Sequence, residues 1–93
     1  MAEPYKDRIE DYCKAHNIEI PVGFNRHSGS QYAAIDMDSD PPKLVARRWF
    51  KQEDVVYYLR NLARGRQIKV LDFKAGVELL YDGGSRLKRG NAF

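Results

Sequence analysis

The first side chains that could do chemistry are Cys13 and His16, which lie three residues apart. Both fall in a segment of helical pattern, so both could face one metal ion. A structural zinc site needs about four ligands, and only His27 and the aspartates could complete the set. A buried cysteine beside a histidine at the helix boundary is the simpler interpretation. We therefore predict neither a metal nor another cofactor.

Three aspartates alternate in the pattern Asp36-x-Asp38-x-Asp40, which resembles the opening of a calcium-binding loop. Such a loop has a glycine at its sixth position and a glutamate at its twelfth. This chain has Pro41 and Arg47 at those positions. The pattern therefore predicts a solvated acidic turn.

Nucleophilic catalysis would require Cys13, Ser28 or Ser30 to lie beside a base such as His27. The chain has neither the G-x-S-x-G turn of hydrolases nor a phosphate loop with lysine and serine. The glycine turn at 83–86 could offer N–H groups to an anion, as many glycine turns can. We expect that the protein is not an enzyme. An enzyme with His27 and the acidic turn beside Cys13 remains the contrary hypothesis.

Charge is distributed unevenly along the chain. Residues 1–42 have a net charge of −4, and residues 43–93 have a net charge of +7. Such asymmetry indicates a polyanionic partner. It is also expected if the two halves attract each other, within one domain or between two copies of the chain.

Basic residues lie on both sides of the main predicted helix and again near the end of the chain. Trp49 and Phe50 fall within the first group, and nucleic-acid bases stack on exposed aromatic rings beside positive charge. This pattern predicts, as an alternative function, a nucleic-acid-binding module that uses the basic surface of residues 43–90. The residues predicted to bind nucleic acid or another anion are Arg47, Arg48, Trp49, Lys51, Arg64, Arg66, Arg86, Lys88 and Arg89.

The element that must position many of these side chains is a helix predicted over residues 52–65. Its apolar residues, Leu62 among them, recur at helical spacing. Acidic residues begin the helix and arginines end it, as the helix dipole favours, and Gly65 can close it in the left-handed conformation. A second helix is predicted over residues 4–16, with Asn17 closing it.

The remaining apolar segments predict strands, two of which form a hairpin. Residues 86–93 read as either a terminal strand or a frayed tail. The whole chain, 1–93, is predicted to be one α+β domain of order α-β-β-β-α-β-β, with both helices on one face of a small antiparallel sheet of about four to five strands. The predicted strands are 18–22, 31–37, 43–48, 67–73 and 77–81.

The single cysteine excludes a disulfide within the chain, and no apolar run resembles a secretion signal or a membrane span. We therefore predict a cytoplasmic protein without a membrane partner. The main functional prediction is a non-catalytic accessory or protein-interaction domain. Its partner would be another protein, or a second copy of the chain that meets it at a sheet edge.

Overall fold

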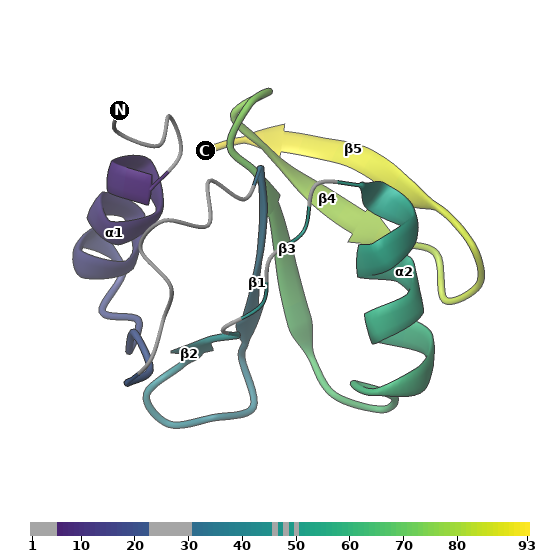
Figure 1. Cartoon of the computed structure of the whole chain (residues 1–93), viewed down its shortest axis with the longest axis horizontal. Coiled ribbons are helices and arrows are strands. Elements are labelled where there is room, and N and C mark those ends of the chain that lie inside the picture. Colours follow the sequence, from purple (N-terminus) through teal and green to yellow (C-terminus); the bar gives the residue numbers. More distant parts are fainter. Residues whose placement is uncertain (1–5, 23–30, 46, 48, 50) are drawn as a thin grey trace.

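The computed structural model describes residues 6–22, 31–45, 47, 49 and 51–93. These residues form two helices and a five-stranded antiparallel sheet, which confirms the predicted α+β fold (Figure 1). The elements are α1 (Lys6–Ala15), β1 (Tyr32–Asp36), β2 (Lys43–Leu44), α2 (Gln52–Asn61), β3 (Ile68–Asp72), β4 (Val77–Tyr81) and β5 (Leu87–Ala92).

The strands lie in the order β2-β1-β3-β4-β5, and every pair of neighbours is antiparallel. The central pair, β1 and β3, runs in register from Tyr32 opposite Asp72 to Asp36 opposite Ile68. The predicted hairpin is confirmed as β3 and β4. The two ends of the sheet are the short strand β2 and the longer strand β5, so these two strands form its edges.

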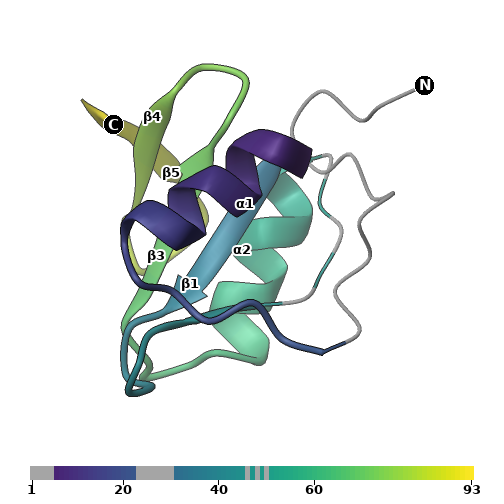
Figure 2. The ribbon, with the colours of Figure 1, turned by 90° about the vertical axis from the view of Figure 1, so that its left-hand side faces the viewer.

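The two helices cover opposite faces of the sheet, and Figure 2 shows α1 in front of β1 with α2 behind it. Cys13 of α1 packs with Ile35, whereas Leu59 of α2 packs with Ala34. Ile35 and Ala34 are successive residues of β1, and successive residues of a strand point to opposite faces. The prediction that both helices lie on one face was therefore wrong. Both sides of the central strands are apolar, so each side needs its own cover.

Two segments with a predicted strand differ in how many of their residues pair in the sheet. The strand predicted at 18–22 is reduced to a single parallel bridge between Glu19 and Lys43. Pro21 has no N–H with which to extend this pairing. Residues 86–93, which the sequence left open between a strand and a frayed tail, form β5 as far as Ala92.

The left-handed residues predicted near the ends of both helices are confirmed. Asn17 follows α1 with a φ of 59°, and Gly65 follows α2 with a φ of 81°. The regular part of α2 ends earlier than predicted, at Asn61. Leu62, which was predicted to face the core, is consequently 55% exposed.

Candidate functional site

The Cys13 thiol is buried against the sheet and is 1% exposed. Burial and the nearby Glu10 carboxylate raise the pKa of Cys13 to about 11. The thiol is therefore protonated at neutral pH, and a protonated thiol is a poor nucleophile and a poor metal ligand. His16 is exposed and stacks on Tyr12, with ring centroids 4.1 Å apart.

Among the residues that the structure describes, no three metal-ligating side chains gather into a potential metal site. His27, Ser28, Ser30, Arg48 and Phe50 lie outside the described residues.

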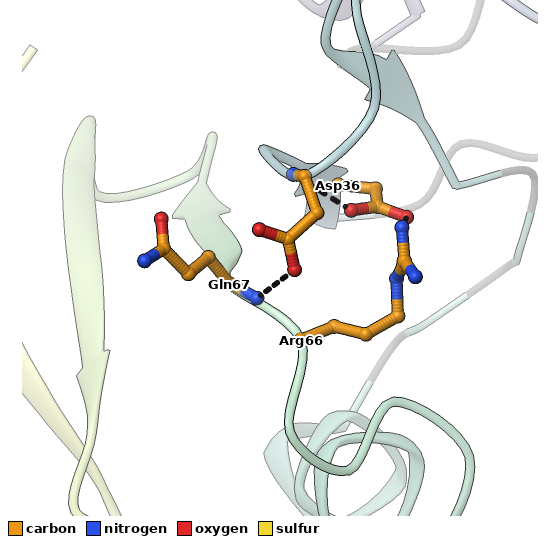
Figure 3. A network of polar contacts seen from close by, with 4 residues as sticks. Asp36, Arg66 and Gln67 are labelled. Atoms are coloured by element: carbon orange, nitrogen blue, oxygen red, sulfur yellow. Dashed lines mark hydrogen bonds and ion pairs between the residues drawn. The ribbon is translucent and has the colours of Figure 1, made fainter.

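The acidic turn ties the end of β1 to the beginning of β3 (Figure 3). Arg66 approaches Asp36 with two nitrogen atoms, at 2.9 and 2.7 Å from the carboxylate oxygen Oδ2. The N–H of Asp38 donates to Asp36 Oδ1, and the N–H of Gln67 donates to Asp38 Oδ2. Burial raises the pKa of Asp36, but the hydrogen bonds from Arg66 and Asp38 outweigh it and hold the pKa below its ordinary value. The carboxylates of Asp36 and Asp38 therefore have a structural role, which is to hold this turn against the start of β3.

The residues predicted to bind nucleic acid have different surroundings in the structure. Trp49 is 4% exposed, with its ring centroid 5.2 Å from that of Tyr58, so it presents no face to a base. The Arg47 guanidinium lies 5.2 Å from the centre of the Tyr58 ring, and Arg66 is paired with Asp36. The other described members of the predicted set are exposed: Lys51, Arg64, Arg86, Lys88 and Arg89.

Strand β5 pairs with β4 on one side only, and no described strand pairs with its other side. The carbonyl of Arg86 accepts a hydrogen bond from the Asp82 N–H, so the backbone of Arg86 faces β4. Backbone groups alternate in direction along an antiparallel strand. The N–H and C=O groups of Leu87 and Arg89 therefore point outward, where an additional strand could pair with them.

The turn before β5 is held by Asp82. Its oxygen Oδ1 accepts hydrogen bonds from the N–H groups of Gly84 and Arg86, at 2.7 and 3.1 Å. These bonds hold the pKa of Asp82 below its ordinary value. The Tyr81 hydroxyl donates to the carbonyl of Gly84 at 2.8 Å. The position at which β5 begins is therefore fixed relative to β4.

Three adjoining cavities lie between α2 and residues 83–87, with volumes of about 280, 270 and 480 Å³. The first and second are both lined by Val56 and Ser85, and the second and third by Arg60 and Asn61. They form one groove along α2, which we call the α2–β5 groove. Its first cavity is also lined by Leu87, the first residue of β5.

The largest cavity of the α2–β5 groove carries positive charge. Arg60 lines it from the last turn of α2 and Arg64 from the turn after the helix, while Gly83 and Gly84 line it from the opposite turn. Within the described part of the chain, neither arginine forms an ion pair or a hydrogen bond, whereas Arg66 is paired with Asp36.

Sequence reasoning identified Arg64 but omitted Arg60 from the predicted binding residues. The available signal was that Arg60 and Arg64 both lie near the end of the predicted helix.

A separate apolar cavity of about 370 Å³ lies between α1 and the C-terminus. Phe93 packs edge-on against Tyr12 and Phe73, with ring centroids 5.2 Å apart in both pairs. The N–H of Phe93 also donates to the carbonyl of Gly76. These contacts hold the last residue against the face of the sheet that α1 covers.

The fold and the groove define a small α+β domain with an open sheet edge beside a partly basic groove. Comparisons with protein-family models, with curated proteins and with solved structures found no match. In the described residues, neither helix is long and apolar enough to span a membrane.

Proposed function

We propose that this domain is a non-catalytic protein-interaction module that binds an extended, acidic segment of another protein as an additional strand on β5. The observation that supports the proposal most directly is the open outer side of β5 next to the α2–β5 groove. A segment that adds to a sheet edge gains main-chain hydrogen bonds, and pockets beside the edge select its side chains.

The charge around β5 favours an acidic segment. Arg86, Lys88 and Arg89 are exposed on β5 and its preceding turn. Arg60 and Arg64 line the largest cavity of the groove, and among the described residues the one carboxylate that lines the groove, Glu53, belongs to its two smaller cavities. Complementary charge speeds the encounter of two partners and disfavours wrong ones. We expect binding to weaken as salt concentration rises, because salt screens exposed charges.

A second copy of the chain fits this edge less well than an acidic segment. An antiparallel pair of two β5 strands centred on Lys88 and Arg89 would place like charges opposite each other. Such cross-strand pairs are destabilising, and charged side chains on an edge are a common protection against self-association. The partner proposed here is therefore a different protein.

The nucleic-acid alternative keeps several exposed basic residues, but it loses one of its two predicted stacking residues, since Trp49 is buried. We retain it only as a prediction that oligonucleotide binding at low salt would support. The predicted cytoplasmic location likewise stays a prediction.

The proposal can be tested with an acetylated octapeptide amide of alternating glutamate and valine, and a matched peptide of alternating lysine and valine. We expect the acidic peptide to shift the NMR signals of the Leu87 and Arg89 amides and to slow their hydrogen exchange. The basic peptide should change neither amide. The proposal is wrong if the acidic peptide leaves both amides unchanged.

Main-chain pairing can be separated from charge at Arg89. Arg89→Pro and Arg89→Gln both remove the charge, but only proline removes the outward N–H. Because this N–H does not face β4, both variants should fold. Losing one hydrogen bond should make Arg89→Pro bind the acidic peptide about tenfold more weakly than Arg89→Gln. Equal affinities would exclude pairing at this position.

A further inference from the structure

The α2–β5 groove ends in its largest cavity, between the last turns of α2 and the Gly83–Gly84 turn. We propose that this cavity binds the C-terminal carboxylate of the partner segment that pairs with β5. This inference rests on the function proposed above, and it specifies which end of the partner is recognised.

Strand direction places the end of the partner near this cavity. All strand pairs in the sheet are antiparallel, and antiparallel pairs outnumber parallel ones in proteins generally. A segment antiparallel to β5 runs from Ala92 towards Leu87, so its C-terminal end leaves the strand beside Ser85. Ser85 lines the two cavities that lead to Arg60 and Arg64.

The cavity has the charge that a carboxylate requires. Arg60 lies in the last turn of α2 and Arg64 in the turn that follows it, and two like charges that line one cavity repel each other. An anion between them relieves this repulsion, and guanidinium groups bind carboxylates with paired, charge-assisted hydrogen bonds. The nearest acidic group of the turn, Asp82, accepts hydrogen bonds from the N–H groups of Gly84 and Arg86.

The wall opposite the arginines leaves room for the end of a chain. At Gly83, where φ is 84°, no atom of the described residues other than those of Gly83 and its two chain neighbours lies within 4 Å of the position that a Cβ would occupy. The cavity volume of about 480 Å³ is the largest of the three in the groove. An extended chain carries a charged carboxylate at its C-terminal end. This end of the partner segment would reach the groove at its largest cavity.

The test compares two forms of the acidic octapeptide. One has a free C-terminal carboxylate, and the other has a C-terminal amide with one additional glutamate at its N-terminus, so that their charges match. We expect the free acid to bind about tenfold more tightly, as one charge-assisted hydrogen-bonded pair would give. Both should perturb the Leu87 and Arg89 amides, because both pair with β5.

Variants of the two arginines test whether the tighter binding of the free acid arises in this cavity. Arg60→Gln and Arg64→Gln should each reduce or remove the advantage of the free acid while leaving the affinity of the amide nearly unchanged. Lys74→Gln removes an exposed charge in the β3–β4 turn and serves as the matched control, with the advantage retained. Folding of each variant is checked by its thermal unfolding midpoint.

Each failure has a distinct meaning. If both peptides bind equally at β5, the carboxylate inference is wrong and the proposed function stands. If Arg60→Gln and Arg64→Gln weaken the amide as much as the free acid, the cavity holds a side chain of the segment, which also overturns the inference. If neither peptide perturbs β5, the proposed function itself fails.

Discussion

At the scale of single residues, three aspartates each accept backbone hydrogen bonds in a turn that follows a strand. Asp36 does so after β1, Asp72 after β3 and Asp82 after β4. Short carboxylate side chains favour such turns because they reach the N–H groups two or three residues ahead. Of the three aspartates that resemble a calcium-binding loop in the sequence, Asp36 and Asp38 therefore have structural partners.

Asp72 is the polar residue buried most deeply among those described, and its loss should destabilise the fold. Its oxygen Oδ1 accepts hydrogen bonds from Gln31 and from the N–H groups of Lys74 and Ala75. Asp72→Ala leaves these donors without an acceptor, so we expect a loss of about 2 kcal/mol in the free energy of unfolding. Asp72→Asn keeps one oxygen acceptor and should cost clearly less. Urea unfolding measures both, and equal losses would contradict this role.

Asp36 should make stability depend on pH in the acid range. Its pKa in the folded protein is held below the ordinary value by Arg66 and the Asp38 N–H, despite the opposing effect of burial. The stabilisation is therefore present above the unfolded pKa of about 3.9, and it is lost as the pH falls through the folded pKa.

Asp36→Asn is the corresponding variant, because it removes the charge and keeps the size. We expect a lower unfolding midpoint than the native chain at about pH 7, and a difference that shrinks between about pH 5 and pH 2. Thermal unfolding across this range provides the measurement. A difference that stays constant with pH would show that the Asp36 charge contributes nothing.

At the scale of elements, α2 and β5 show how local pattern and local geometry shape the proposed site. The face of α2 that carries Val55, Val56 and Leu59 is buried, as its spacing predicts. The adjoining flank, with Tyr57 and Arg60, lines the groove together with Val56. Strand β5 stays at the edge, and its pairing with β4 shifts register between Val77 and Leu79, as is common at sheet edges.

Gly90 is required by close packing between β5 and β4. A Cβ at this position would lie 2.9 Å from the carbonyl oxygen of Glu78 and 3.2 Å from Leu80 Cγ. We expect Gly90→Ala to destabilise the protein by about 1–3 kcal/mol, because the two strands must separate to accommodate it. Gly84→Ala is the control, since its Cβ would meet only Asp82 at 3.5 Å. Equal urea midpoints for the two variants would contradict this.

At the scale of the whole molecule, two apolar clusters lie on opposite faces of one sheet. Figures 1 and 2 show the two helices that cover these faces. Leu71 belongs to the cluster under α1, and its neighbour Val70 belongs to the cluster under α2. The central strands contribute side chains to both clusters. A substitution that destabilises one cluster should therefore also destabilise the other. We therefore expect the domain to unfold as one cooperative unit.

Leu71→Ala tests this coupling, because Trp49 reports on the other face and is the only tryptophan. Removing the buried leucine should cost about 2–5 kcal/mol. The urea midpoint followed by Trp49 fluorescence should fall together with the midpoint followed by circular dichroism. Separate midpoints for the two signals would show that the two faces unfold independently.

The sequence alone predicted the features that depend on neighbours along the chain. The helical spacing in α2, the hairpin of β3 and β4, and the left-handed positions Asn17 and Gly65 were all predicted correctly. Helical and strand periodicities, and the backbone freedom of glycine and asparagine, act over a few residues, so they can be read locally.

Only the tertiary structure decided which face each helix covers and which polar groups meet. Arg66 and Asp36 are thirty residues apart in the chain, and Trp49 is buried because α2 and the sheet close over it. Arg60 and Arg64 face the Gly83–Gly84 turn only because the β4–β5 hairpin folds beside α2. Such distances are set by packing between segments far apart in sequence, which local periodicity does not encode. The sequence therefore shows which residue types line the groove, but it does not show that these residues lie close together in the fold.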